Sequence, residues 1–270
     1  MRSSASSGPV ILLGCGRLGS AIVEGWLKTD AVASFDLIIL TPSEKAAAEA
    51  ARAAGARINP PSDQLKGARV LVLAVKPAMW REALTPLTAH LGPQTRLVSV
   101  MAGVLAADIS EAAARPVARV MPTTAVAQAR GVAALWSSDP ETRELARALF
   151  APMADIVDLD DEAQIDTATA VAGSSPAFIY AFVQALAAAG QADGLSPEAA
   201  QRLARGALRS AGAGVETDET LAALMARIAS PGGTTRAGLD AMEQSGELKR
   251  AATAAVSAAL QQARSLQRLV

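Results

Sequence analysis

The 270-residue chain is poor in the side chains from which many catalytic and metal sites are built. It has one cysteine, Cys15, and one histidine, His90. An internal disulfide and a multi-cysteine or histidine-rich metal site are therefore excluded, and a Ser-His-Asp triad has few ways to form. A single cysteine also suits a reducing cytosol. We expect no bound metal, and a chemistry that does not depend on imidazole or thiolate.

An excess of positive charge is also lacking. Lys and Arg number 25 against 26 for Asp and Glu, a formal net charge of −1, and aromatic residues make up only 3% of the chain. The sequence offers neither a basic surface for a phosphate backbone nor aromatic platforms for bases. It therefore argues against nucleic acid as a partner.

Signals for secretion and membrane insertion are weak. A signal peptide needs an apolar region of about 7–15 residues, whereas the apolar run after the polar N-terminal arm, residues 10–13, is broken by Gly14. Residues 167–192 carry no charge, but much of their apolarity is alanine and no Lys/Arg cluster flanks them. We interpret them as a helix buried in a soluble assembly, and we expect a cytoplasmic protein with no membrane partner.

Hydrophobic residues make up 51% of the chain, enough for a sizeable core. In the first half, short apolar runs alternate with helical stretches, which is typical of a parallel sheet covered by helices on both faces. We predict strands at residues 10–13, 37–40, 70–75, 97–100, 117–120 and 156–159, and helices at 18–28, 43–54, 79–87 and 105–113.

From about residue 162 the sequence becomes helical and rich in alanine. We predict helices at residues 162–171, 177–189, 197–217, 219–228, 235–245 and 247–269. The expected fold is an α/β Rossmann-type parallel-sheet domain over residues 8–160, followed by an all-α domain over 161–270. Because alanine buries little area, the helical half alone would have a thin core. We expect a second chain to complete it, in a homodimer or a larger homo-oligomer built from dimers.

A glycine-rich turn follows the first predicted strand. Residues 14–19 read G-C-G-R-L-G, which fits G-x-G-x-x-G, and they open the first predicted helix. Gly14 allows a tight turn, Gly16 leaves room for a pyrophosphate, and Gly19 lets helix and strand pack closely. The N–H groups of the helix N-terminus favour an anion. The turn predicts a dinucleotide site, and a turn that serves only close packing is the alternative.

The end of the second predicted strand indicates which dinucleotide is bound. An NAD site usually has an acidic residue there for the ribose 2′-OH. Asp36 precedes that strand and so lies at its wrong end, whereas the residues after the strand read T-P-S-E-K. Hydroxyl groups and a lysine tolerate a 2′-phosphate. This favours NADPH over NADH, although Glu44 leaves NADH possible.

The third and fourth predicted strands end at the same edge, where ligands bind in open α/β folds. The third strand ends in A-V-K-P at residues 74–77, in which Lys76 either contacts the cofactor or is a solvated loop lysine. The fourth ends in S-V-M-A-G at residues 99–103, where small residues let a cofactor ring lie against the backbone. A plain strand-to-helix turn is the alternative there.

In the helical half, S-P-G-G-T-T at residues 230–235 introduces a helix. Pro231 and the two glycines force a turn. The N–H groups of Thr234 and Thr235 then form a nest for a carboxylate, to which Ser230 and the threonine hydroxyls add neutral donors. An ordinary helix N-cap preceded by a turn is the alternative.

Taken in order, these motifs resemble those of pyrroline-5-carboxylate reductase. The resemblance runs from about residue 10 to 250, and S-P-G-G-T-T is its most specific part. The matching segments are G-C-G-R-L-G-S-A-I, T-P-S, A-V-K-P, S-V-M-A-G-V, M-P-T-T-A, G-S-S-P-A-F and S-P-G-G-T-T-R-A-G-L. It implies a Rossmann domain, a helical domain that forms an intertwined dimer, and reduction of Δ¹-pyrroline-5-carboxylate to L-proline with NAD(P)H, the last step of proline biosynthesis.

The resemblance also implies which residues form the site. The cofactor pyrophosphate would be held by Gly14, Gly16, Arg17 and Leu18. The adenosine ribose and its phosphate would be met by Thr41 and Ser43. The path towards the nicotinamide would be lined by Ala74, Val75, Lys76, Pro77, Met101 and Ala102. Those that hold the substrate are Ser230, Gly232, Gly233, Thr234 and Thr235, with Glu162 as a further carboxylate. The Thr235 hydroxyl would be the catalytic contact, through a hydrogen bond to the ring nitrogen.

Such a reaction suits a chain with so little histidine and cysteine. A cyclic imine, especially when protonated, already accepts hydride well, so the protein mainly has to align the reactants and exclude water.

Two departures from the family pattern leave other activities open. The family usually has M-P-N-T-P where residues 121–125 read M-P-T-T-A, and Leu-Lys-Asp where Leu-Met-Ala precedes Arg227. Arg227 is either a ligand for a phosphate or carboxylate or an exposed helix residue. One alternative is a reductase of another cyclic imine or of a β-hydroxyacid, although Lys249 is the only lysine after Lys76. The other is a catalytically silent protein that binds NADPH as a sensor or scaffold.

Overall fold

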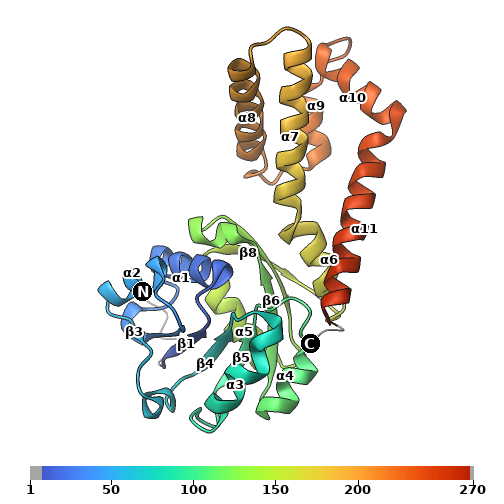
Figure 1. The fold of residues 1–270 in the computed structure, drawn as a ribbon. Helices are drawn as coiled ribbons and strands as arrows, with labels where there is room; N and C mark the ends of the chain where they lie inside the picture. The colour runs from blue at the N-terminus through green and yellow to red at the C-terminus, as the bar shows by residue number, and fades with distance from the viewer. Residues whose placement is uncertain (1–7, 268–270) are drawn as a thin grey trace. The chain divides into compact units, whose positions relative to one another are not determined.

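The computed structural model describes residues 8–267, so the N-terminal arm before Gly8 lies outside the described residues. Within this range the chain forms two compact units (Figure 1). The first contains residues up to Gly173 and the end of the last helix from Leu260, and the second is Ser174–Ala259. The division comes later than residue 160 because Ile165 packs with Met121 and Ala134 of the sheet.

In residues 8–173, eight strands form one sheet in the order β3-β2-β1-β4-β5-β6-β7-β8. All neighbours are parallel except β6 and β7, so the expected Rossmann-type sheet is confirmed. The strands are β1 Val10–Leu13, β2 Leu37–Leu40, β3 Arg57–Ile58, β4 Val70–Leu73, β5 Arg96–Ser99, β6 Val117–Pro122, β7 Gly131–Trp136 and β8 Ala154–Asp158.

Two of these strands and one helix were not expected from the sequence. The two-residue β3 is too short to produce a pattern. The strand β7 returns antiparallel to β6 because only a short 3-10 turn, η4 (Thr124–Gln128), joins them, and a parallel return needs a crossover of a dozen or more residues. The missed helix, α5 (Pro140–Phe150), then makes the crossover to β8, which is parallel to β7.

Helices cover both faces of the sheet, because successive residues of a buried strand point to opposite faces. Val10 and Leu12 of β1 lie in one apolar cluster with residues of α1, α2 and α5, whereas Ile11 and Leu13 lie in another with residues of α3 and α4. These helices are α1 Arg17–Thr29, α2 Ala46–Ala53, α3 Trp80–Thr88 and α4 Ala106–Ala113, joined by the 3-10 turns η1 Ser34–Asp36, η2 Ser62–Leu65 and η3 Pro77–Met79.

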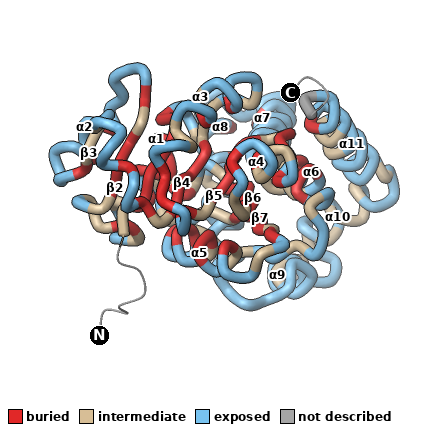
Figure 2. Tube along the Cα trace, turned by 90° about the horizontal axis from the view of Figure 1, so that it is seen from below, coloured by how far each residue is buried: buried red, intermediate tan, exposed pale blue. Residues whose placement is uncertain are grey.

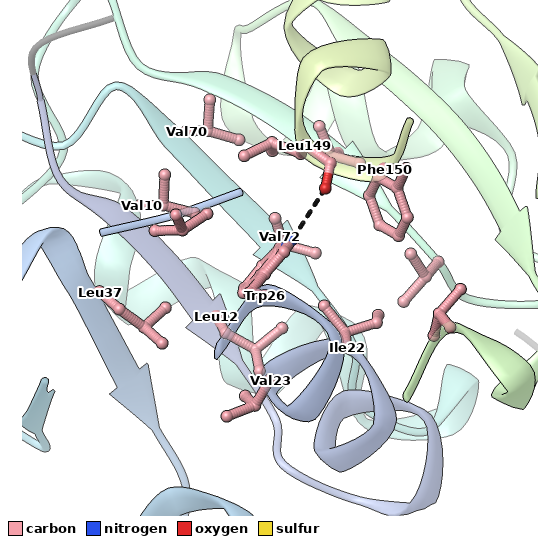
Figure 3. Packing of buried hydrophobic residues seen from close by; sticks show 14 of the residues in the cluster. Val10, Leu12, Ile22, Val23, Trp26, Leu37, Val70, Val72, Leu149 and Phe150 are labelled. Carbon is pink, nitrogen blue, oxygen red and sulfur yellow. Dashed lines mark hydrogen bonds between the residues drawn. The ribbon is translucent and has the colours of Figure 1, made fainter. Parts of the chain in front are cut away.

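Trp26 links α1 to the end of α5 inside the first of these clusters (Figure 3). Its Nε1 donates to the Leu149 carbonyl oxygen at 2.9 Å, and its ring meets that of Phe150 edge to face, with the centroids 6.4 Å apart. The bond satisfies the one polar atom of a fully buried indole. It thereby fixes the helix that carries the glycine-rich turn.

The second unit is helical and buries little of its own surface. It contains α7 Ser175–Ala192, α8 Pro197–Gly214, α9 Leu221–Ile228, α10 Thr234–Ser245 and most of α11 Glu247–Gln267. The buried residues where α7 packs on α8 are Ala187, Ala200 and Ala204, with the partly buried Val183 against them. Figure 2 shows α11 largely exposed, in contrast to the buried strands of the sheet. The predicted thin core is confirmed for the described residues.

One helical stretch is long and apolar enough to cross a membrane by length and composition. It runs over Gln164–Ala192, through α6 (Gln164–Ala168) and a π-helical turn, η5 (Thr169–Gly173), into α7. A single stretch of this kind is weak evidence for a membrane span. Its exposed apolar side chains, which include Ile179, Tyr180, Phe182 and Leu186, equally suit burial against another chain.

The N-terminus of α5 is capped by Asp139. Its Oδ2 accepts hydrogen bonds from the backbone N–H of Thr142 at 2.8 Å and from the Thr142 hydroxyl. These bonds, the one from the hydroxyl first, lower the pKa of the Asp139 carboxyl below its ordinary value.

We predict that Asp139→Ala lowers the free energy of unfolding by about 1 kcal/mol at pH 7, the usual cost of removing an N-cap. A lowered native pKa means that the ionised cap stabilises fully above its unfolded-state pKa, about 3.9, and is lost as pH falls through the native pKa. The difference in unfolding temperature from the parent should therefore narrow near pH 3. The exposed Asp155 of β8 provides the control, since Asp155→Ala should have little effect. A difference that stays equal at both pH values would contradict the role of the ionised cap.

Candidate functional site

Four strands end together at one edge of the sheet. The registers pair Leu13 of β1 with Leu40 of β2 and Leu73 of β4, and Leu73 with Ser99 of β5, so these four carboxyl ends are level. The chain order reverses here, because β2 and β4 lie on either side of β1. Ligands of open α/β sheets bind at such a point. The structure thus brings the four predicted cofactor loops to one edge.

The turn between β1 and α1 has no room for side chains at two of its glycines. Gly14 has φ +98°, and a Cβ on it would lie 2.7 Å from the Ala74 carbonyl oxygen. A Cβ on Gly19 would lie 2.2 Å from the carbonyl oxygen of Gly14. The backbone N–H of Gly14 donates to the Leu40 carbonyl at 2.8 Å, which ties the turn to β2. The expected tight turn and close helix–strand packing are confirmed.

Gly16 is different, because it faces open space. It is the N-cap of α1, and a Cβ on it would meet no atom within 4 Å. The helix has no side-chain cap and no acidic residue in its first turn, in which Arg17 is exposed and Leu18 is half-buried. The amides of this turn and the positive end of the helix dipole fit a pyrophosphate.

The loop after β2 is fixed by a residue that the sequence analysis missed. The Thr41 backbone N–H donates to Oδ1 of Asn59 at 2.9 Å, and Nδ2 of Asn59 donates to the Thr41 carbonyl at 2.8 Å. The Thr41 hydroxyl donates to the Ser43 carbonyl at 3.1 Å, and the polar side chains that this loop exposes are those of Ser43, Glu44 and Lys45. Asp36 lies before β2, as expected. The available signal was Asn before two prolines, because Asn tolerates the left-handed φ of +48° found here.

The A-V-K-P loop continues directly from β4. The Ala74 backbone N–H donates to the Leu13 carbonyl at 2.8 Å, which holds this loop beside the glycine turn. Ala74, Val75 and Pro77 are half-buried, and Lys76 is exposed at the start of η3. The strand therefore stops at Leu73, two residues before the predicted end, because the chain turns away from the sheet here.

The loop after β5 contains Met101, which is buried, and Ala102, which is half-buried. A buried guanidinium supports it: Nη2 of Arg119 donates to the Met101 carbonyl at 3.3 Å, and Nη1 donates to Oε1 of Glu162 at 3.1 Å. The same Oε1 accepts from the Ala106 backbone N–H at 2.7 Å. The sequence analysis missed Arg119. These contacts also give Glu162 a structural role inside the first unit that its prediction as a substrate-site carboxylate did not include.

The S-P-G-G-T-T segment of the second unit forms a turn into α10. Gly232 has φ +72°, and the Gly233 N–H donates to the Ser230 carbonyl at 3.0 Å. The helix begins at Thr234, with Gly233 as an N-cap that makes no side-chain capping bond, and Thr234 and Thr235 are both exposed. This arrangement leaves the first-turn amides and two hydroxyls for a ligand such as a carboxylate.

The nearest charged side chain of that turn is already paired. Nε of Arg236 donates to Oδ1 of Asp240 at 2.8 Å, and its Nη2 lies 3.3 Å from Oε1 of Glu243. These hydrogen bonds, the one to Asp240 first, raise the pKa of Arg236. Arg236 is therefore engaged within its own helix, and the backbone amides and threonine hydroxyls at the start of α10 are neutral groups.

Thr123 and Arg227, which lie in the two segments that depart from the family pattern, both have partners in the structure. The Thr123 hydroxyl accepts from the Val132 N–H at 3.3 Å, which joins the end of β6 to β7. Arg227 is exposed and paired with Glu219, so its interpretation as a surface helix residue is favoured. In residues 8–267 no three His, Cys, Asp or Glu side chains are grouped so that they could hold a metal ion.

Comparison with known proteins matches both parts of the chain to families of oxidoreductases. The family described as "Pyrroline-5-carboxylate reductase dimerisation" matches residues 162–266, and "NADP oxidoreductase coenzyme F420-dependent" matches residues 9–103. Pyrroline-5-carboxylate reductase of Pseudomonas aeruginosa is 31% identical over 244 residues, which cover 88% of this chain and 89% of the relative.

Two solved structures match over nearly their whole length. The structure of a pyrroline-5-carboxylate reductase from Coxiella burnetii is 25% identical, with a TM-score of 0.86 over 97% of this chain and 99% of that one. The pyrroline carboxylate reductase of Plasmodium falciparum, with NADP bound, has the same fold at 24% identity, with a TM-score of 0.78 over 97% and 98%. The chain with these two units and these loops therefore belongs to the pyrroline-5-carboxylate reductase family.

Proposed function

We propose that this protein reduces Δ¹-pyrroline-5-carboxylate to L-proline with NADPH, the last step of proline biosynthesis. The observation that carries the proposal is the start of α10, where S-P-G-G-T-T presents an uncapped helix N-terminus and two exposed threonine hydroxyls. This combination suits a small carboxylate with a neighbouring nitrogen. It occurs in a chain of the reductase family that also has a dinucleotide edge.

The loops at the sheet edge fit NADPH. Gly16, Arg17 and Leu18 would hold the pyrophosphate at the start of α1, where Gly14 keeps the turn tight. Ser43 would meet the ribose phosphate on the loop set by Thr41, where Lys45 offers a positive charge and Glu44 is the one acidic residue. The segments that would border the nicotinamide are Ala74, Val75, Lys76 and Pro77, and Met101 with Ala102. Bound NADPH supplies the hydride for the reduction.

The substrate is held by neutral donors in this proposal. The N–H groups of Thr234 and Thr235 and the Ser230 hydroxyl bind the carboxylate, and Gly232 and Gly233 give the turn its shape. The Thr235 hydroxyl hydrogen-bonds the ring nitrogen. The carbon of the protonated C=N bond receives the hydride, and the nitrogen keeps its proton as the amine forms. No imidazole or thiolate base is needed, because alignment and exclusion of water supply the catalysis.

The second unit supports a homo-oligomer. Its region matches a family described by dimerisation, and its helices expose large apolar side chains, among them Tyr180, Leu203 and Met225. We propose a homodimer, or a larger assembly of dimers, that works in the cytoplasm without nucleic-acid or membrane partners. Burial of these side chains against a second chain would supply the core that the unit lacks.

The direct test is oxidation of NADPH by the purified protein with and without Δ¹-pyrroline-5-carboxylate, with NADH in parallel. We expect rapid substrate-dependent oxidation with L-proline as product, and a slower rate with NADH. NADPH binding without any oxidation would contradict the proposal. A panel of other cyclic imines would then separate another reductase from a silent NADPH-binding protein.

We predict that Thr235→Ala lowers kcat/KM for the imine by roughly tenfold or more, because the hydrogen bond to a charged nitrogen is lost. Thr235→Ser, which keeps the hydroxyl, should retain most of the activity. The dissociation constant for NADPH, measured by fluorescence titration, should not change in either variant. Thr253→Ala on α11 is the control for loss of an exposed hydroxyl, since Thr253 bonds only its own helix among the contacts described. Unchanged kcat/KM in Thr235→Ala would remove Thr235 from the site.

We predict that Gly16→Ala weakens NADPH binding by about tenfold or more, because a methyl group would occupy the space needed by the pyrophosphate. The unfolding temperature should stay close to that of the parent, since a Cβ at this position meets no protein atom within 4 Å. Gly67→Ala is a matched control, as Gly67 is exposed and equally open. Equal NADPH affinity in both variants would place the pyrophosphate elsewhere.

A further inference from the structure

Arg119 is among the largest fully buried side chains in the described chain, with 1% of its surface exposed. It lies on β6 beside Ser99, the last residue of β5. Removing a guanidinium from water is costly unless it is paired and hydrogen-bonded, and a buried ion pair is often no more stable than apolar residues of the same volume. Stability alone therefore explains this residue poorly, and its partners are more informative.

The partners of Arg119 lie at the two ends of one loop. At the start of the loop, Nη2 donates to the Met101 carbonyl at 3.3 Å. At its end, Glu162, which Nη1 holds at 3.1 Å, accepts the Ala106 backbone N–H at 2.7 Å. Ala106 is the first residue of α4, whose N-cap, Leu105, makes no side-chain capping bond. Glu162 thus caps α4 from a distant part of the chain.

Between these two anchors the loop has few constraints from regular structure. It contains Gly103, with φ +73°, and Ala102, which packs beside Met121, Ala134 and Ile165. A planar guanidinium can bind a carbonyl and a carboxylate in fixed directions at the same time, which an ammonium group does poorly. The pair therefore fixes the backbone of the loop at both ends, in addition to the buried side chains of Met101 and Val104, which pack in the apolar cluster with residues of α3 and α4.

We propose that Arg119 and Glu162 are positioning residues for hydride transfer, which hold the loop of residues 101–105 so that Met101 and Ala102 align the nicotinamide. The inference rests on the proposed function and deepens it. Neither side chain touches the reacting atoms in this proposal. Their effect falls on the alignment of the reactants, whereas the pyrophosphate and ribose phosphate contacts belong to other loops.

We predict that changes to this pair lower kcat but leave the affinity for NADPH nearly unchanged. In Arg119→Lys and Glu162→Gln, kcat should fall on the order of 10- to 100-fold, because small displacements of aligned reactants are costly. The dissociation constant for NADPH should change by less than about threefold, since most of its contacts remain. The primary isotope effect on kcat with NADPH deuterated at the transferred position should rise as hydride transfer becomes more rate-limiting.

A measurement without cofactor tests the loop itself. Hydrogen exchange of the amides of residues 101–106 should become faster in Glu162→Gln, whose side chain holds Arg119 and Ala106 less firmly. Exchange in the glycine turn at residues 14–19 should stay unchanged. Equal exchange of the loop in parent and variant would overturn the proposal.

A double variant and a control variant distinguish a loss of stability from a loss of loop positioning. Arg119→Met combined with Glu162→Gln removes both charges and should recover the unfolding temperature lost in Arg119→Met alone and in Glu162→Gln alone, but not kcat. Arg96→Met breaks a different ion pair, with Asp139 and Glu141, at the other end of β5. It should leave kcat and the isotope effect unchanged. If kcat of the double variant recovers together with its stability, the pair is only structural and the proposal is wrong.

The activity of the parent enzyme shows whether a failure concerns the positioning role or the proposed function. If the parent does not reduce Δ¹-pyrroline-5-carboxylate, the proposed function fails, and the exchange measurement still decides whether the pair holds the loop. If the parent is active and the variants keep its kcat and isotope effect, only the positioning role is overturned.

Discussion

The close contact of β1, α1 and β4 at the glycine turn is the constraint on which the cofactor edge depends. A Cβ on Gly14 would clash with the carbonyl oxygen of Ala74, and a Cβ on Gly19 would clash with the carbonyl oxygen of Gly14. Because both positions are glycine, the helix can start directly against the sheet. Only this approach puts the N-terminus of α1 level with the ends of the neighbouring strands. The open side of Gly16 is then left as the space that an anion can enter.

The other loops of this edge are held by single side chains from elsewhere in the chain. Asn59 holds the backbone of Thr41 from both sides, and Arg119 with Glu162 holds both ends of the loop after β5. Loops are mobile unless such contacts fix them. A site of this kind depends on its supporting residues as much as on those that touch the ligand.

The helical unit has a small buried core and a large exposed apolar surface. Its alanines allow close contact of helices but bury little area, and large apolar side chains such as Tyr180 and Leu203 remain exposed. Apolar surface of this kind gains stability when it is removed from water, and the region matches a family described by dimerisation. The turn at the start of α10 needs no second chain, since the hydrogen bond from Gly233 to Ser230 forms within the unit.

The sequence by itself determined the features that depend on neighbouring residues. The Rossmann-type alternation, the turn at residues 14–19 and the start of α10 at S-P-G-G-T-T follow from local patterning and from what glycine and proline allow. Tertiary structure alone decided the antiparallel β7, the division of the chain at Gly173, the clamp of Asn59 on Thr41, and the pairing of Arg119 with Glu162, which lie 43 positions apart. The physical reason is that a buried charge finds its partner through the packing of strands and helices, and that packing leaves no periodic trace around either residue.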